Sequence, residues 1–157
     1  MKTLSNKAFE SVMQLFHSVS GIRLGAHKQA LVAGRLQKLA QEAGEPDVDS
    51  YVDKVVRGDT PATEMTRVID RLTTNETYFF REPQHFADLQ SRLARVQGKE
   101  PFLVWSAASS SGEEAYSTAM VLAEALGRKP WQVIGTDLST TVVESAQRAL
   151  YPLERAR

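Results

Sequence analysis

Apolar residues recur at helical spacing through the first half of the chain. Between Ser5 and Val19 they follow an i, i+3, i+4, i+7 order, which predicts an amphipathic helix that ends at Gly21. We expect a later helix to begin with Thr60 as its cap and Pro61 at its first position. In all, the spacing predicts four helices, over 5–19, 27–43, 51–58 and 60–72. We therefore expect a small all-helical domain in residues 1–72.

The pattern changes in the second half of the chain. Pro83 predicts the start of another helix, which continues to about Val96. Strand patterns then alternate with helix patterns, an order typical of a parallel α/β sheet. The strands are predicted over 102–106 and 131–137, and the helices over 113–126 and 139–150. We predict an α + α/β fold: a helical bundle, then two β-α units forming the first half of a Rossmann-like domain. Its regions are 1–72, 73–99 (linker and helix) and 100–157.

The predicted sheet has too few strands to be stable alone. Parallel strands need neighbours and helices on both faces, and only two strands are predicted. We expect either a fragment of a longer protein or a sheet completed by partner chains, as a homodimer or a swapped assembly, since a free sheet edge favours such pairing. Trp105 and Trp131 lie in the two strands, so we expect both in the core.

The composition limits which kinds of partner and which cellular compartment we expect for this protein. Lysine plus arginine equals aspartate plus glutamate at 19 each, so net charge gives no indication of nucleic acid as a partner. The chain has no cysteine, which excludes thiolate metal sites, and its three histidines lack metal-ligand spacing. No apolar run approaches the roughly 20 residues of a membrane span, and the first residues show no signal peptide. We expect a cytoplasmic protein without a metal and without membrane insertion.

The stretch VWSAASSSGEEAYSTAM, residues 104–120, leaves the first predicted strand through six small residues. In parallel α/β units this turn is where a nucleotide-like ligand lies, and small side chains let the backbone approach it closely. The stretch also has a purely structural interpretation, because Ser111 and Glu114 have the S-x-x-E spacing of a helix capping box. Glu113 is expected on the solvated surface of the helix.

The chemistry of this turn favours a ligand with a positive group and no phosphate. Its single glycine, Gly112, is not the G-x-G-x-x-G of dinucleotide sites, and its two acids would repel a phosphate. S-adenosylmethionine has an ammonium, a sulfonium and no phosphate, so it fits better. Asp137 ends the second strand, where an acid commonly binds ribose hydroxyls. Alternatively Asp137 caps the next helix, although Ser139 is as good a candidate.

Several longer motifs carry a family resemblance. The stretches LTTNETYFFREPQHF (72–86), VWSAASSSGEEAYSTAM (104–120) and IGTDLSTTVVESAQRALY (134–151) resemble the CheR chemoreceptor methyltransferases, and SGIRLGAHKQALVAGRLQKLA (20–40) resembles their helical N-terminal domain. The resemblance implies a methyltransferase domain that uses S-adenosylmethionine. It also implies methyl transfer to glutamate side chains on the cytoplasmic helices of chemotaxis receptors, with S-adenosylhomocysteine as the second product.

The resemblance further implies roles for individual residues. Glu114 would contact the methionine part of the cofactor, and Asp137 its ribose. Arg81 would line the cofactor and substrate pocket, and we expect its guanidinium to act in catalysis by binding a carboxylate, of either the incoming glutamate or the cofactor. The alternative for Arg81 is a salt bridge with Glu76 or Glu82 on a solvated helix end. The full set of implied cofactor-binding residues is Asn75, Thr77, Arg81, Ala107, Glu114 and Asp137.

A basic helix face is the candidate surface for docking the substrate. Arg35 and Lys38 are three residues apart in a predicted helix, so they share a face. The resemblance implies that this face meets acidic receptor helices, whereas an ordinary solvated face is the plainer interpretation. Two other functions stay open: a non-catalytic module that binds receptors or a response regulator, and a nucleotide-binding oxidoreductase, which the missing glycine fingerprint disfavours.

Overall fold

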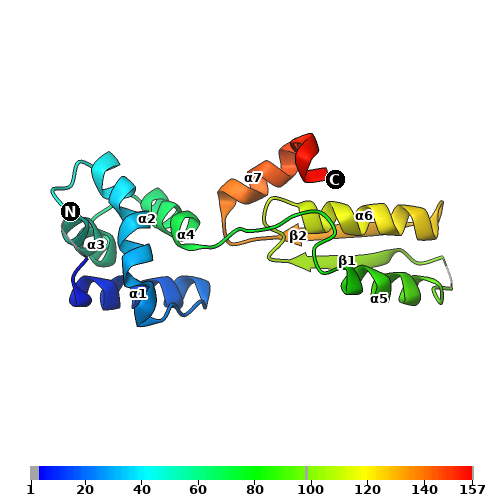
Figure 1. Cartoon of the computed structure of the whole chain (residues 1–157), viewed down its shortest axis with the longest axis horizontal. Coiled ribbons are helices and arrows are strands. Elements are labelled where there is room, and N and C mark those ends of the chain that lie inside the picture. Colours follow the sequence, from blue (N-terminus) through cyan, green and yellow to red (C-terminus); the bar gives the residue numbers. More distant parts are fainter. Residues whose placement is uncertain (1–3, 98, 157) are drawn as a thin grey trace. The chain divides into compact units, whose positions relative to one another are not determined.

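The chain divides into two compact units, Met1–Thr74 and Asn75–Arg157 (Figure 1). The computed structural model describes residues 4–97 and 99–156. Within these ranges every helix is too short or too polar to cross a membrane. The fold class expected from the sequence is confirmed, because a helical unit precedes a unit in which strands and helices alternate.

The first unit is a helical bundle around one apolar core. Helix α1 packs against α3, and α2 packs against both α3 and α4. The core is formed by the buried apolar faces that the helical spacing predicts, with Val32 and Leu36 of α2 fully buried. A short 3-10 turn precedes α2, so this α-helix begins later than expected. The elements are α1 (Asn6–Ser20), η1 (Ala26–Lys28), α2 (Gln29–Glu42), α3 (Val48–Arg57) and α4 (Ala62–Leu72).

The helix starts in this unit are fixed by local hydrogen bonds. The Ser5 hydroxyl accepts the N–H of Ala8 at 3.2 Å and caps α1, as polar residues at this position commonly do. The expected cap at Thr60 is wrong. Helix α4 begins one residue later, after Pro61, whose extended backbone lets its carbonyl accept the N–H of Glu64 at 2.8 Å.

A polar network extends from the helical core to its surface. The Tyr51 hydroxyl, on a side chain only 1% exposed, donates to Glu64 at 2.8 Å. Arg67 donates to both carboxylate oxygens of Glu64, at 3.0 and 3.1 Å, and also pairs with Glu42. The charge of Glu64 is therefore compensated, as burial of a carboxylate requires.

The second unit packs two parallel strands against two helices. The strands are in register from Phe102 opposite Trp131 to Ala107 opposite Thr136. Alternate strand residues, such as Val104 and Val133, pack with α5 and α6 in one apolar cluster. The elements are α5 (Pro83–Leu93), β1 (Phe102–Ala107), α6 (Glu113–Leu126), β2 (Trp131–Thr136), α7 (Thr140–Arg148) and η2 (Leu153–Ala156).

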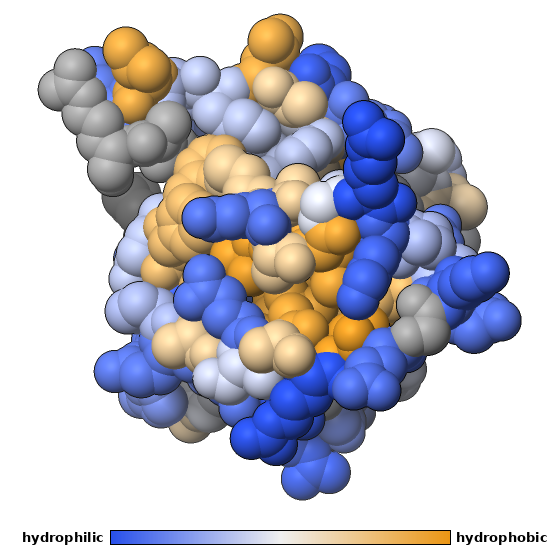
Figure 2. Space-filling model, turned by 90° about the vertical axis from the view of Figure 1, so that its right-hand side faces the viewer, coloured by the Kyte–Doolittle hydropathy of each residue, from blue (hydrophilic) through white to orange (hydrophobic). Residues whose placement is uncertain are grey.

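The opposite face of this sheet stays exposed. Leu103, Trp105 and Ile134 are 63%, 69% and 48% exposed, because strand alternation points them away from α5 and α6. The expectation of a buried Trp105 is therefore wrong, although its indole N–H donates to Thr136 at 2.9 Å. Trp131 points to the covered face and packs against the core. Viewed from the right-hand side of Figure 1, the molecule also shows apolar residues with hydrophilic residues around them (Figure 2).

Candidate functional site

The turn between β1 and α6 has an unusual backbone. Ala108, Ser110 and Gly112 all have positive φ, of 60°, 50° and 98°. This conformation costs a residue other than glycine roughly 1–3 kcal/mol, so surrounding contacts must compensate. Helix α6 begins at Glu113 without a side-chain cap. The expected capping box is therefore wrong, and the Ser111 hydroxyl instead donates to the Glu113 carboxylate at 2.6 Å.

Asp137 connects this turn to the end of β2. One of its carboxylate oxygens accepts the N–H of Ser110 at 2.8 Å, and the other accepts the N–H of Ser139 at 2.9 Å. The N–H of Ser109 donates to the carbonyl of Thr136 at 2.8 Å, which extends the contact between the two strands. Ser139 is the residue that caps α7, so the helix-capping alternative belongs to Ser139 rather than to Asp137.

The segment that follows residue 74 lies against the same turn. The Ser110 hydroxyl donates to the carbonyl of Asn75 at 3.0 Å, and the N–H of Phe80 donates to the hydroxyl of Ser117 at 2.9 Å. Ser110 therefore joins three segments that are distant in sequence: the segment that contains Asn75, the turn itself, and the end of β2 with Asp137. Thr77, between these two anchors, is half-buried.

The two acids at the start of α6 differ sharply in exposure. Glu114 is exposed and accepts a hydrogen bond from the Ser106 hydroxyl at 2.7 Å. Glu113 is fully buried, so the expectation that it is solvated is wrong. Its neighbour Ser117 donates to its carbonyl at 2.7 Å. The acid that remains accessible to a ligand is therefore Glu114, at the base of the turn.

Arg81 is exposed and fixed by the main chain of its own segment. Its guanidinium donates to the carbonyl of Glu76 at 2.6 Å and lies over the ring of Tyr78, 5.8 Å from the ring centre. The contact with Glu76 is thus to the backbone and not the expected alternative, a salt bridge to the side chain. Ala107, at the end of β1, is exposed.

Two residues of this site were missed by the sequence argument. Ser110 was only one of several small residues, although it is the one that contacts both Asn75 and Asp137. Tyr151 follows α7, and its hydroxyl donates to the carbonyl of Ser111 at 2.6 Å. Nothing in the periodicity of the chain indicates this contact, because it joins residues 40 positions apart.

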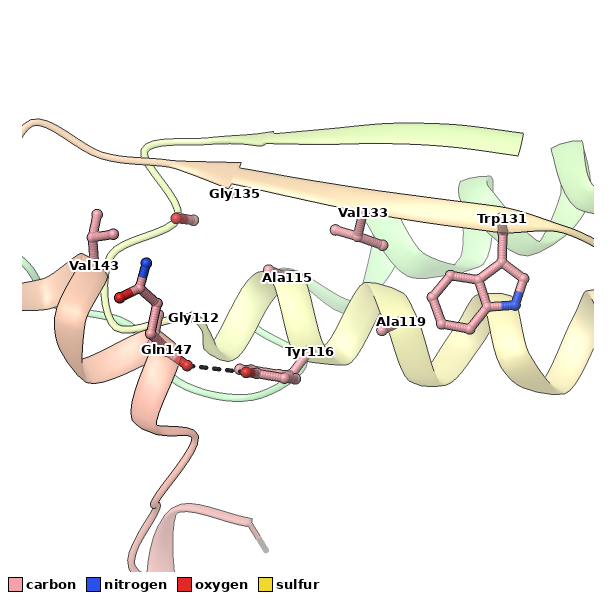
Figure 3. Close-up of a pocket in the computed structure, with 11 residues that line it drawn as sticks. Gly112, Ala115, Tyr116, Ala119, Trp131, Val133, Gly135, Val143 and Gln147 are labelled. Atoms are coloured by element: carbon pink, nitrogen blue, oxygen red, sulfur yellow. Dashed lines mark hydrogen bonds between the residues drawn. The ribbon is translucent and has the colours of Figure 1, made fainter. Parts of the chain in front are cut away.

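A separate cavity of about 330 Å³ lies between β2, α6 and α7 (Figure 3). Its walls are mostly apolar, and the residues expected to bind a cofactor are not among those lining it. Small side chains and glycines leave this space open between Trp131, Tyr116 and Gln147. The cavity is therefore adjacent to the turn without being the expected site.

The two basic residues expected to dock a substrate lie beside a hollow in the helical unit. The hollow, of about 620 Å³, is lined by residues of α2 and by the end of α4. Arg35 donates to the carbonyls of Leu72 and Thr73, at 2.9 and 3.2 Å, so it also joins α2 to α4. Lys38 is exposed and lies 3.8 Å from Glu42. Leu31 is 41% exposed at the same hollow.

The chain is similar to two adjoining family models. The all-alpha domain of CheR methyltransferases matches residues 7–73, and the S-adenosylmethionine (SAM) binding domain of CheR methyltransferases matches residues 75–157. The histidines and acids of the described residues form no group of three that could hold a metal ion.

Curated relatives extend the same match. The chemotaxis protein methyltransferases of Salmonella typhimurium and Escherichia coli are each 38% identical over 156 residues, which cover 98% of this chain and 53% and 54% of theirs. Chemotaxis protein methyltransferase 2 of Pseudomonas aeruginosa is 37% identical over 152 residues, covering 94% of this chain and 52% of that protein. The chain thus spans about half the length of the curated relatives it matches. On these matches, the chain belongs to the CheR methyltransferase family.

Proposed function

We propose that this chain binds S-adenosylmethionine and docks chemotaxis receptors, as part of an enzyme that methylates glutamate side chains of those receptors. The match to a SAM binding domain and the names of the relatives support this function. The observation that carries it is the hydrogen bond between Ser110 and Asp137. That bond sets a carboxylate from the end of β2 beside the small-residue turn after β1.

The polar groups around this turn fit S-adenosylmethionine. A carboxylate has about four lone-pair sites, and two backbone N–H groups occupy two of those on Asp137, which leaves acceptors for ribose hydroxyls. Glu114 accepts one hydrogen bond from Ser106 and can also pair with the ammonium of the methionine part. Ala107 and Ala108 are small and exposed, so the backbone can approach the cofactor closely. A phosphate at this acidic turn would instead be repelled.

The reaction needs positioning more than acid–base chemistry. When bound, S-adenosylmethionine supplies a methyl group on a positively charged sulfur. The acceptor glutamate, with a pKa of about 4.3, is already an anion at neutral pH, so no side chain has to remove a proton. Holding two reactants in line contributes up to about 7–11 kcal/mol.

We assign the orientation of the acceptor carboxylate to Arg81. Its side chain is exposed, and one of its five N–H donors is used by the carbonyl of Glu76. The remaining donors can form the paired hydrogen bonds that guanidinium groups make with carboxylates. Asn75 and Thr77, on the same anchored segment, complete the proposed set of pocket residues.

We assign receptor docking to the hollow between α2 and α4. Three basic residues and one acid line it, so its net charge is positive and attracts acidic side chains: Arg35, Lys38, Arg71 and Asp70. Gly34 presents no side chain there, and its Cβ position has open space around it. The proposed partners are the cytoplasmic helices of chemotaxis receptors, which places the protein in the cytoplasm. Association of two chains through the exposed face and edges of the sheet is a further proposal, which light scattering would test.

Calorimetric titration of S-adenosylhomocysteine into this chain tests cofactor binding. We expect binding that Asp137→Ala abolishes or weakens at least tenfold, the effect of about 1.4 kcal/mol. Asp88→Ala is the matched control, because Asp88 is an exposed acid on α5 that pairs with Arg92. Equal affinity in the wild type and the Asp137 variant contradicts the proposed ribose contact. No binding by the wild type favours a non-catalytic module.

Titration with a receptor cytoplasmic fragment tests docking. We expect Lys38→Glu to weaken binding several-fold at low salt and less at high salt, because screening reduces charge attraction. Lys7→Glu makes the same change of net charge on an exposed position of α1 and should have little effect. Equal losses in both variants would show that net charge, rather than the hollow, controls binding.

A further inference from the structure

Tyr151 is not among the residues expected to bind the cofactor, but it contacts the turn after β1. Its hydroxyl donates to the backbone carbonyl of Ser111 at 2.6 Å. Its ring meets the rings of Phe79 and Tyr116 edge-on, with centres 5.0 and 5.8 Å apart. These edge contacts fix the ring, so the hydroxyl is directed at the turn by packing on two sides.

Ser111 makes hydrogen bonds with two other side chains. Its carbonyl accepts from Tyr151, and its hydroxyl donates to the fully buried carboxylate of Glu113 at 2.6 Å. The residues on either side of Ser111, namely Ser110 and Gly112, both have positive φ. Ser110 is not a glycine, so its conformation persists only where contacts such as these determine it.

The fit between Tyr151 and the turn is close. A Cβ atom added to Gly112 would lie 2.8 Å from the Tyr151 hydroxyl oxygen and 2.9 Å from the Ala146 Cβ, distances that real contacts do not show. Burial and the nearby charge of Glu113 raise the pKa of Tyr151 to about 12. The hydroxyl therefore stays protonated, and stays a donor, across the physiological pH range.

We propose that Tyr151 is a positioning residue for the cofactor site. Through Ser111 it fixes the 108–112 turn in the shape that presents the N–H of Ser110 to Asp137, before any ligand binds. A turn ordered in advance spares the ligand the cost of ordering it, which increases affinity. This inference rests on the proposed function, since the ligand concerned is S-adenosylmethionine or its product.

The matched variants for the test are Tyr151→Phe and Tyr116→Phe. Both remove one hydroxyl from the same aromatic cluster, but the Tyr116 hydroxyl donates to the carbonyl of Ala146 in α7 at 2.9 Å (Figure 3). Titration with S-adenosylhomocysteine gives the affinity of each variant. Amide hydrogen exchange, with and without saturating ligand, gives the order of the turn.

We expect Tyr151→Phe to raise the dissociation constant about tenfold, the size of one lost hydrogen bond, and Tyr116→Phe to change it less than about twofold. Without ligand, the amides of residues 110–113 should exchange faster in Tyr151→Phe than in the wild type. The exchange rates of β1 and of the rest of α6 should not change. Saturating ligand should restore their protection, because binding then orders the turn.

Other outcomes overturn the inference. Equal affinity losses in the two variants would assign the effect to the aromatic cluster as a whole. Faster exchange throughout β1 and α6 would show general destabilisation instead of a loosened turn. If the wild type binds no ligand, the proposed function is wrong. The role of Tyr151 in ordering the turn is then tested by hydrogen exchange alone. Selective acceleration at 110–113 then supports the role of Tyr151, and unchanged exchange rejects it.

Discussion

The carboxylate of Asp137 accepts the backbone N–H of Ser110 at 2.8 Å, across the ends of two parallel strands. Its second oxygen accepts the N–H of Ser139 at the start of α7. The same side chain that is proposed to bind ribose thus also joins the β1–α6 turn to the end of β2. On the proposed function, stability and ligand affinity are therefore coupled at this residue.

Asp137→Asn should lower the free energy of unfolding of the second unit by about 1–3 kcal/mol. The amide that replaces one carboxylate oxygen is a donor, so it faces an N–H of Ser110 or Ser139 and leaves a polar group unsatisfied. Urea unfolding followed by tryptophan fluorescence measures this, since Trp105 and Trp131 both lie in the second unit. An unchanged midpoint would show that neither hydrogen bond matters.

Tyr51→Phe should remove a pH dependence of stability at alkaline pH. Burial, then the hydrogen bond and charge of Glu64, raise the pKa of Tyr51 above its ordinary value of 10.0. A raised pKa means that the stabilisation is complete below pH 10. It is lost as the pH rises above 10 towards the folded-state pKa, because the unfolded chain releases the proton first.

Urea unfolding followed by helix circular dichroism, between pH 8 and pH 11, should show a steeper loss in the wild type than in Tyr51→Phe. Tyr151, which has a pKa of about 12, is present in both proteins, so the difference isolates Tyr51. At pH 7 the variant should also be less stable by about 1 kcal/mol, since Glu64 loses a donor. Parallel pH profiles would assign the alkaline loss to other groups.

The helices and strands of this fold were predicted well because short local sequence patterns determine where each one forms. Helix α6 begins and ends where the pattern places it, at Glu113 and Leu126. Strand β2 ends one residue before Asp137, close to its expected end. The errors in helix caps, such as Thr60 and Ser111, arise because one residue decides the cap geometry and several nearby residues have suitable side chains.

Exposure and long-range contacts could not be predicted in the same way. Glu113 and Glu114 are adjacent acids with the same helical propensity, yet one is fully buried and the other exposed. What separates them is tertiary: Glu113 lies near Tyr151, whose pKa its charge raises, whereas Glu114 accepts from Ser106 of β1 and stays exposed. Trp105 differs from Trp131 for a similar reason, because the two residues point to opposite faces of the sheet.

Arg35→Ala and Lys38→Ala should differ in their effect on the stability of the helical unit. Arg35 donates to two carbonyls at the end of α4, so its removal should destabilise the helical unit by about 1–2 kcal/mol. Lys38 is exposed, with one weak ion pair to Glu42, so its removal should change stability by less than about 0.5 kcal/mol. Thermal unfolding by circular dichroism measures both. Similar melting temperatures would show that Arg35 has no structural role.

Arg81→Lys should abolish most methyl transfer while leaving the fold intact. A lysine cannot donate to the Glu76 carbonyl and also form paired hydrogen bonds with a carboxylate. Transfer of labelled methyl groups to a chemotaxis receptor, in a protein of the relatives' full length, measures the loss, and circular dichroism checks the fold. Unchanged turnover would remove Arg81 from the proposed mechanism.

Gly112→Ala should destabilise the second unit by about 1–3 kcal/mol, because φ of 98° strains any residue with a Cβ atom. Part of this loss should depend on Tyr151, whose hydroxyl would lie 2.8 Å from the new methyl group. Introduced together with Tyr151→Phe, the same substitution should therefore cost less than it does alone. A double-mutant cycle by urea unfolding, followed by tryptophan fluorescence, measures this coupling. Additive losses would mean that the strain lies in the backbone of Gly112 or in the contact with Ala146, and that the Tyr151 hydroxyl does not constrain the turn.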